Sequence, residues 1–225
     1  MSIDRYGLVA HYQHYLTDGK LLDLSGKGNH GTINGATPTT DHNGRANRGW
    51  LFQNANLDYI DLGETVFLNT SNPFTLICSV KLTNYAAIYP ILFSLKTNNT
   101  IFSVGLSNQT PYLGVAIGSS ANWSRLKTND PATLFTSQYN HIAVTYNGNG
   151  SSTNANFEIY VNGVKKTLTN SDNFGVVSSI KNTIGAHQTA TTTYYTNGVI
   201  NQAAIYNVAK SDSEIQKLYN YWRTH

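Results

Sequence analysis

Cysteine is almost absent from the 225-residue chain, which carries only Cys78. A single cysteine excludes an intrachain disulfide, so packing and hydrogen bonds alone have to hold the fold together. Cys78 lies within an apolar alternation that runs from Phe74 to Leu82. This position predicts a small residue of the core and not a catalytic thiol.

Charge is also scarce, since Asp, Glu, Lys and Arg make up 12% of the residues against roughly 25% in an average soluble domain. The net charge is only +3, and the basic residues are scattered, with Lys165 and Lys166 as the one adjacent pair. A nucleic-acid-binding protein needs a basic stripe, so no nucleic-acid partner is expected. A surface made from Asn, Thr, Ser and Gln is typical of extracellular or virion proteins.

Long hydrophobic runs are missing as well. No stretch approaches the roughly 20 apolar residues of a membrane-spanning helix. Residues 1–7 contain no apolar core of a signal peptide. We therefore predict an extracellular or virion location, reached after removal of a signal, by another export route, or by assembly into a virus particle.

What the chain does contain is alternation of apolar and polar residues, broken at short intervals by Asn, Gly and Ser, which is typical of a β-sandwich. At Asn162-Gly163 the sequence predicts a type I′ hairpin, because both residues tolerate positive φ. The expected strands are residues 8–13, 57–62, 74–82, 90–95, 100–106, 112–118, 139–146, 157–161, 164–168, 183–186 and 199–206.

The carboxyl end departs from this alternation. Residues 211–214, SDSE, form a capping box, in which Ser211 and Glu214 satisfy each other's free backbone groups. The apolar residues that follow have helical spacing and predict one buried stripe; they are Ile215, Leu218, Tyr219 and Trp222. The chain is thus expected to be a single all-β domain over residues 1–225, a two-sheet antiparallel jelly-roll sandwich with a short C-terminal helix.

Six segments resemble, in the same order, the laminin-G-like domains of the concanavalin A-like lectin and glucanase superfamily. They are GLVAHY (7–12), LDLSGKGNHGT (22–32), FTLICSVKL (74–82), YNHIAVTYNG (139–148), IYVNG (159–163) and GVINQAAIYN (198–207). Ser79 replaces the Trp usual in the third motif. The resemblance implies a concanavalin A-like jelly roll, and it says less about function, because function resides in sites and not in folds.

The glycine-rich loop of residues 23–31 is the first candidate site. Asp23 and Asn29 supply side-chain oxygens, and oxygen ligands suit a structural Ca²⁺. The resemblance implies a third ligand at Asn201, where the family usually has Asp, and losing that charge lowers the expected affinity. The alternative is that Asp23 and Asn29 are turn residues that cap their own backbone.

Aromatic and amide side chains in expected loops form a second candidate site. An exposed aromatic face stacks on the C–H groups of a sugar ring, and amides bind its hydroxyls. The candidate sugar-binding residues are Tyr85, Tyr89, Trp123, His187, Gln188, Tyr194 and Tyr195. The alternative for each tyrosine is an ordinary strand position with an amphipathic tip at the sandwich surface.

Catalytic patterns are missing from the sequence. The glucanases of the superfamily carry E-x-D-x-E or E-x-D-x-x-E, and neither occurs here. We therefore expect a non-catalytic, carbohydrate- or surface-binding module in an adhesion or virion-associated protein, whose partner is a cell-surface glycan or polysaccharide. The alternatives are a purely structural capsid or surface-layer protein, whose partners are neighbouring subunits in a homo-oligomer or lattice, and a polysaccharide hydrolase or lyase.

Overall fold

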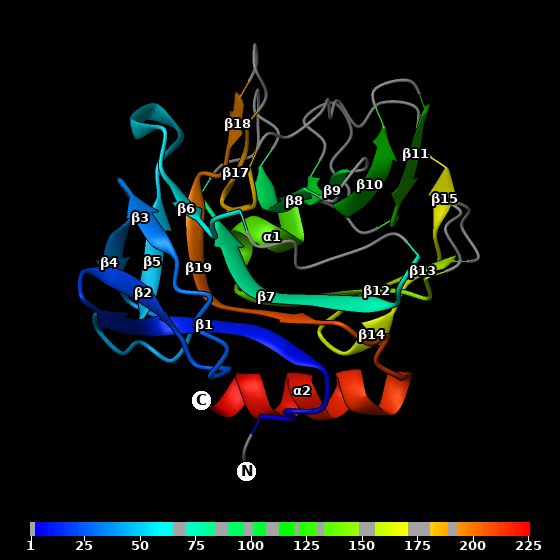
Figure 1. Ribbon diagram of the computed structural model, residues 1–225, viewed down its shortest axis with the longest axis horizontal. Coiled ribbons are helices and arrows are strands. Elements are labelled where there is room, and N and C mark those ends of the chain that lie inside the picture. The colour runs from blue at the N-terminus through cyan, green and yellow to red at the C-terminus, as the bar shows by residue number, and fades with distance from the viewer. Residues whose placement is uncertain are drawn as a thin grey trace.

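The computed structural model describes residues 3–64, 71–83, 90–96, 101–106, 113–119, 122–129, 133–148, 156–170, 181–188 and 193–225. Two antiparallel sheets face each other, and one helix covers the outer face of the larger sheet (Figure 1). The predicted jelly-roll sandwich with a short C-terminal helix is therefore confirmed. Tyr85 and Tyr89 lie outside the described residues.

The larger sheet has nine strands. In order they are β14 (Val164–Lys165), β13 (Phe157–Val161), β12 (Asn140–Tyr146), β7 (Phe74–Leu82), β19 (Gly198–Tyr206), β1 (Leu8–Thr17) and β2 (Lys20–Asp23), with β5 (Gly49–Phe52) beside β19 and β4 (Thr37–Thr39) beside β5. The last strand of the chain thus lies between the first strand and β7. This placement joins segments from opposite ends of the sequence.

The smaller sheet has eight strands. In order they are β15 (Thr169–Asn170), β11 (Asn122–Lys127), β10 (Leu113–Ser119), β9 (Ile101–Leu106), β8 (Ile91–Lys96), β16 (Thr183–Ile184), β6 (Tyr59–Asp61) and β3 (Thr32–Asn34). A separate hairpin is formed by β17 (Ala186–Gln188) and β18 (Thr193–Tyr195), and short helical turns lie at α1 (Thr133–Ser137) and Asn54–Asn56. The sequence analysis did not foresee β2 to β5, β11, β15, β18 or α1.

The central strands of the larger sheet are buried on both faces. On β7, Cys78 points into the core between the sheets, and its neighbour Ile77 belongs to a second apolar cluster under the C-terminal helix. Burial raises the pKa of the Cys78 thiol, which agrees with its predicted role as an inert core residue. Two-sided burial explains why β7 is apolar almost throughout, as strands covered on both faces usually are.

The hairpin predicted at Asn162-Gly163 is confirmed. Both residues have positive φ, 54° and 77°, and Val161 pairs with Val164 across the turn. The returning strand β14 is shorter than expected, because it ends at Lys165.

The C-terminal helix α2 (Asp212–Thr224) begins at the predicted capping box, where the Ser211 backbone N–H donates to Glu214 Oε2 at 2.8 Å. Ile215, Leu218 and Trp222 are buried against the outer face of the larger sheet, and Tyr219 is half-buried beside them. The predicted apolar stripe is therefore a packing surface. No helix among the described residues has the length and apolarity needed to cross a membrane.

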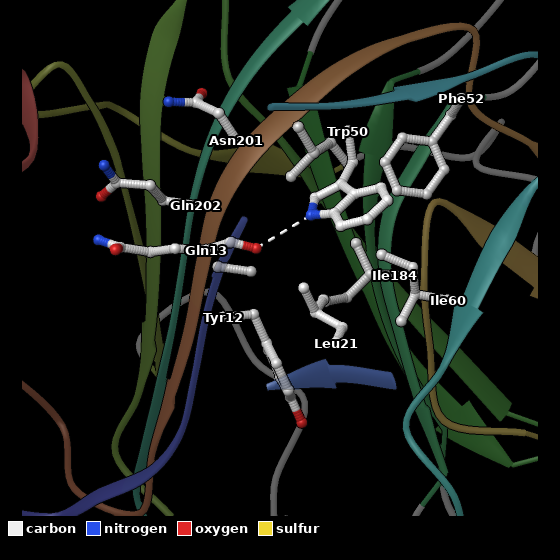
Figure 2. A pocket seen from close by; sticks show the side chains of 11 residues that line it. Tyr12, Gln13, Leu21, Trp50, Phe52, Ile60, Ile184, Asn201 and Gln202 are labelled. Carbon is white, nitrogen blue, oxygen red and sulfur yellow. Dashed lines mark hydrogen bonds between the residues drawn. The ribbon is translucent and has the colours of Figure 1, made fainter. Parts of the chain in front are cut away.

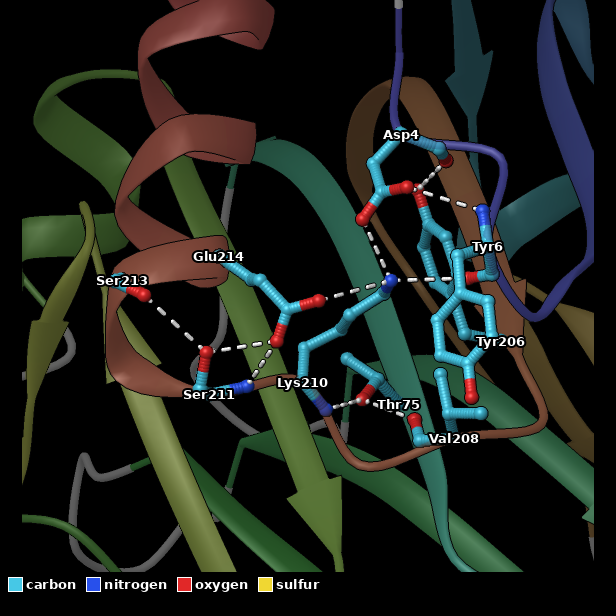
Figure 3. Close-up of polar contacts among 9 residues, drawn as sticks. All are labelled: Asp4, Tyr6, Thr75, Tyr206, Val208, Lys210, Ser211, Ser213 and Glu214. Carbon is cyan, nitrogen blue, oxygen red and sulfur yellow. Dashed lines mark hydrogen bonds and ion pairs between the residues drawn. The ribbon is translucent and has the colours of Figure 1, made fainter.

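A buried lysine links α2 to the amino-terminal segment (Figure 3). The Lys210 side chain is fully buried, and its ammonium group donates to Asp4 Oδ2 at 2.6 Å, to the Tyr6 carbonyl at 2.9 Å and to Glu214 Oε1 at 3.3 Å. It also lies 4.9 Å from the ring centroid of Tyr206, close enough for a cation–π interaction. The Lys210 ammonium group thereby connects residues 4–6 with the first turn of α2.

Candidate functional site

One polar and aromatic cluster forms on the outer face of the smaller sheet, and it begins on β6. Ile60 points into the core and is 1% exposed, so strand alternation directs Tyr59 and Asp61 to the opposite face. Both of these side chains are half-buried. The inward position of Ile60 thus leaves the Tyr59 ring and the Asp61 carboxylate on the outer face of the smaller sheet.

Lys181 completes this part of the cluster from the neighbouring chain segment. Its ammonium group donates to Asp61 Oδ2 at 2.9 Å and lies 5.4 Å from the centre of the Tyr59 ring. The hydrogen bond to Asp61 raises the pKa of Lys181. The adjacent residue Asn182 fixes the backbone, because its amide donates to the Gly63 carbonyl and accepts from the Lys96 N–H.

The β17–β18 hairpin carries two tyrosines on its opposite faces. His187 pairs with Tyr194, and their rings are stacked with centroids 6.3 Å apart. Tyr195 pairs with Ala186 and lies on the other face, where its ring centroid is 6.5 Å from that of Tyr59. We call Tyr59, Asp61, Lys181 and Tyr195 the tyrosine–lysine cluster.

The tyrosine–lysine cluster combines ring faces with a charged hydrogen-bonding pair. Each Asp61 oxygen accepts one hydrogen bond, from the Gly63 N–H and from Lys181, and a carboxylate oxygen has room for a second donor. The ring of Tyr59 remains partly exposed. An arrangement of this kind can stack on the apolar face of a sugar ring while the carboxylate accepts hydrogen bonds from its hydroxyls.

The structure places the predicted sugar-binding residues in different environments. Tyr195 contacts Tyr59 in the cluster and Tyr194 lies on the opposite face of the hairpin, whereas His187 is fully buried and its Nδ1 lies 2.8 Å from Ser94 Oγ. His187 was expected to be an exposed ligand contact. That expectation is wrong, because the His187 ring is buried and stacks against Tyr194. Trp123 lies in β11 and Gln188 in β17 by their backbones, and their side chains are outside the described part of the structure.

Three residues of the cluster were missed by the sequence analysis as ligand contacts, namely Tyr59, Asp61 and Lys181. The alternation of Tyr59, Ile60 and Asp61 carries a signal, since it places both polar residues on the outer face. Lys181 follows β6 by about 120 residues in sequence, so no local pattern predicts its contact with Asp61.

The candidate calcium loop is saturated by protein hydrogen bonds. Asp23 Oδ1 accepts from the backbone N–H groups of His11 and Ser25, both at 2.9 Å, and Oδ2 accepts from Ser25 Oγ at 2.8 Å and from the Asn29 N–H at 3.0 Å. The Asn29 amide donates to the Val9 carbonyl. All four lone-pair positions of the Asp23 carboxylate are used, so these residues do not fit a calcium ion in this arrangement.

The third predicted calcium ligand, Asn201, has other contacts. It lines a small cavity of about 10 Å³ between apolar side chains and strand β19, and Figure 2 shows its amide directed away from the apolar residues. Its Nδ2 lies 2.8 Å from the Nδ1 of His42. Trp50 lines the same cavity and donates from Nε1 to the Gln13 carbonyl at 3.0 Å, as expected of a core residue.

The loop geometry therefore favours the turn alternative, with Asp23 capping its own backbone. Within the described ranges, no group of three or more His, Cys, Asp and Glu side chains is placed to hold a metal ion. Calcium binding stays a prediction that a titration tests.

Two carboxylates do approach each other on the surface, but their environment differs from that of a catalytic pair. Glu158 and Asp212 both accept from the Tyr160 hydroxyl, at 2.5 and 2.7 Å, and both pair with Lys165. The Tyr160 hydrogen bond and then the Lys165 charge lower the pKa of Asp212. A glycosidase needs one carboxyl group with a raised pKa to act as general acid.

The fold and the clustered aromatic residues define a lectin-like jelly roll. Residues 54–216 match a laminin-G family model described as "Concanavalin A-like lectin/glucanases superfamily". The chain therefore belongs to that superfamily, as the resemblance of its six motifs indicated. The comparison with curated protein sequences finds no match.

Several solved structures share the fold. Domain 4 of AbnA, an extracellular arabinanase of family GH43 from Geobacillus stearothermophilus, was solved with arabinotriose, and it aligns at 22% identity with a TM-score of 0.63 over 94% of this chain and 98% of that domain. The binding domains of Paraclostridial Mosquitocidal Protein 1 and of botulinum neurotoxin serotype D align at 16% and 15% identity, both with a TM-score of 0.66 over 96% of this chain.

This chain spans about half of each toxin binding domain, with 52% of their length covered. At these identities the likeness establishes the fold alone. Two of these three structures are described as binding domains.

Proposed function

We propose that this protein is a non-catalytic binding module that recognises a glycan through the tyrosine–lysine cluster. The observation that carries the proposal is the contact of Tyr59, Lys181 and Asp61, which brings an aromatic ring and a charged hydrogen-bonding pair together on the outer face of the smaller sheet. The arabinotriose complex of AbnA domain 4 supports carbohydrate as the class of ligand.

The proposed setting is a surface outside the cytosol, where the module acts in an adhesion or virion-appendage protein. The low charge supports this setting, and so do neighbours taken from an extracellular arabinanase and from toxins. The proposed non-catalytic role is supported by the surface position and lowered pKa of Asp212 in the close carboxylate pair.

A glycan array followed by titration with the best polysaccharide tests the proposal. Tyr59→Ala removes a ring face of the cluster and is expected to weaken binding by about tenfold or more, as loss of a central aromatic contact does. Tyr15→Ala is the matched control, because Tyr15 is exposed and lies near Tyr221 of α2, away from the cluster.

Two results would overturn the proposal. One is the absence of binding to any polysaccharide at millimolar protein, and the other is binding that Tyr59→Ala leaves unchanged. If instead this variant dissociates a ring or lattice of the protein in size-exclusion chromatography, the purely structural role is correct and the cluster is a subunit contact.

A further inference from the structure

A second site lies on the other side of the molecule, where the carboxyl-terminal half of α2 crosses the outer face of the larger sheet. A cavity of about 160 Å³ opens there between the helix, strands β7 and β12, and the segment around residue 42. The residues on which its chemistry depends are His42, Ser79, His141, Tyr219, Trp222 and Arg223.

Buried polar atoms without partners concentrate around this cavity. Both ring nitrogens of His141 and the Nε1 of Trp222 have no hydrogen-bond partner, although the two residues are only 4% and 2% exposed. Leaving such a group unsatisfied is energetically costly, so native proteins rarely do so without a bound water, ion or ligand. A volume several times the roughly 30 Å³ of one water molecule gives room for such a ligand.

The two rings are held in place by their neighbours. The backbone N–H of His141 donates to Asn162 Oδ1 at 2.9 Å, and its ring meets Trp222 edge-on at a centroid distance of 5.3 Å. Trp222 also contacts His11, with centroids 6.0 Å apart. Each of the three nitrogen atoms exposes less than 1 Å² of surface, so a ligand in the cavity reaches them after a small shift of the rings.

The charge around the cavity has one sign. Arg223 lines it, with the guanidinium 5.8 Å from the centroid of Tyr219, and none of the described residues that line it is acidic. Burial, and then the charge of Asp41, raise the pKa of the lining residue Tyr139 to about 12. The Asp41 carboxylate is occupied by Arg45 and by the backbone N–H of Asn43.

We propose that this cavity binds a small oxyanion, a carboxylate or sulfate group, through Trp222 Nε1, one ring N–H of His141 and the Arg223 guanidinium. Burial lowers the pKa of His141 to about 3, so its ring is neutral near pH 7 and offers one donor and one acceptor. An anion complements a site that has fixed donors, a cationic rim and no carboxylate. The anion can be free in solution or can be the acidic group of a sugar.

Calorimetric titration of the whole protein at low ionic strength with D-glucuronate, acetate, sulfate and D-glucose tests the proposal. At least one anion is expected to bind while glucose does not, and stronger binding of glucuronate than of acetate would identify an acidic sugar as the source. The NMR signals of the His141 ring are expected to shift on binding, and its pKa should rise, because a nearby anion favours the imidazolium.

Variants locate the binding. Trp222→Phe keeps the ring and removes the N–H donor, and Arg223→Gln removes the charge; each is expected to weaken anion binding by about tenfold or more, the usual effect of a hydrogen bond to a charged group. Lys20→Gln makes the same change of charge on exposed β2 and should leave binding unchanged. Tyr59→Ala should also leave it unchanged, so the result is independent of the proposed glycan site.

The proposal is overturned if none of the three anions binds, if glucose binds as tightly as the anions, or if Trp222→Phe and Arg223→Gln bind like the natural protein. If Trp222→Phe fails to fold, the His141 signals of the natural protein decide the question. Anion binding that leaves those signals unmoved places the anion elsewhere and also overturns the proposal.

Discussion

Replacing Lys210 with methionine is expected to destabilise the fold by about 2–4 kcal/mol. Lys210→Met preserves most of the buried side-chain volume and removes the charge, so packing changes little. The partly buried carbonyl of Tyr6 then loses its donor, at a cost of about 0.5–1.5 kcal/mol, and the cation–π contact with the Tyr206 ring is lost, at about 0.5–2 kcal/mol. Asp4 and Glu214 lose their partner as well.

The contribution of these two carboxylates is small, because their side chains are 38% and 34% exposed and water can solvate them again. Ion pairs with this degree of exposure are worth about 0–1 kcal/mol each. The total is therefore below the roughly 3–5 kcal/mol that follows when a fully buried pair is broken.

Urea unfolding followed by fluorescence measures the free energy, and scanning calorimetry should show a Tm lower by about 5–15 °C for a chain of this size. Lys217→Met is the matched control on an exposed position of the same helix and should change the stability by less than about 0.5 kcal/mol. If Lys210→Met is as stable as the natural protein, Lys210 does not link the amino-terminal segment to α2.

Three further predictions concern pH, glycine and calcium. Burial lowers the pKa of His11 to about 4 and that of His141 to about 3, so below pH 6.5 the unfolded chain binds more protons than the folded one. Stability should therefore fall as the pH drops from about 6.5 to about 4, by roughly 3 kcal/mol for His11 alone, and His141→Phe should reduce the dependence measured by urea unfolding. Gly185→Ala should cost about 2–4 kcal/mol, because φ is +85° and the new Cβ would lie 2.4 Å from the Phe52 ring, whereas Gly19→Ala, with φ +74° and open space, should cost about 1 kcal/mol in the same assay. Millimolar Ca²⁺ should leave the Tm where EDTA leaves it; a rise on the order of 5 °C or more would restore the calcium assignment.

The candidate site was only partly predictable. Tyr194 and Tyr195 were identified from their residue type and loop-like surroundings, and of the two Tyr195 belongs to the cluster through its contact with Tyr59. The same reasoning proposed His187, which the structure buries beneath Tyr194. Residue type can suggest which side chains bind sugars. The exposure of a side chain depends on which other strands pack against it, and no local sequence pattern predicts that β17 packs against β8.

Sequence alone determined the features that depend on near neighbours in the chain. The segment from Phe74 to Leu82 forms a strand with those bounds, because it carries the apolar residues that a strand covered on both faces needs. Asn162-Gly163 turns because both residues accept positive φ, and the SDSE box starts the final helix because its side chains satisfy the first free backbone groups.

Tertiary structure decided everything that joins distant segments. It placed the last strand between β1 and β7, brought Lys181 onto Tyr59, and buried His141 beneath Trp222 with its ring nitrogens unpaired. These contacts span about 80 to 200 residues. They arise from the way two sheets and a helix share their buried faces, and that arrangement is a property of the whole chain and not of any segment within it.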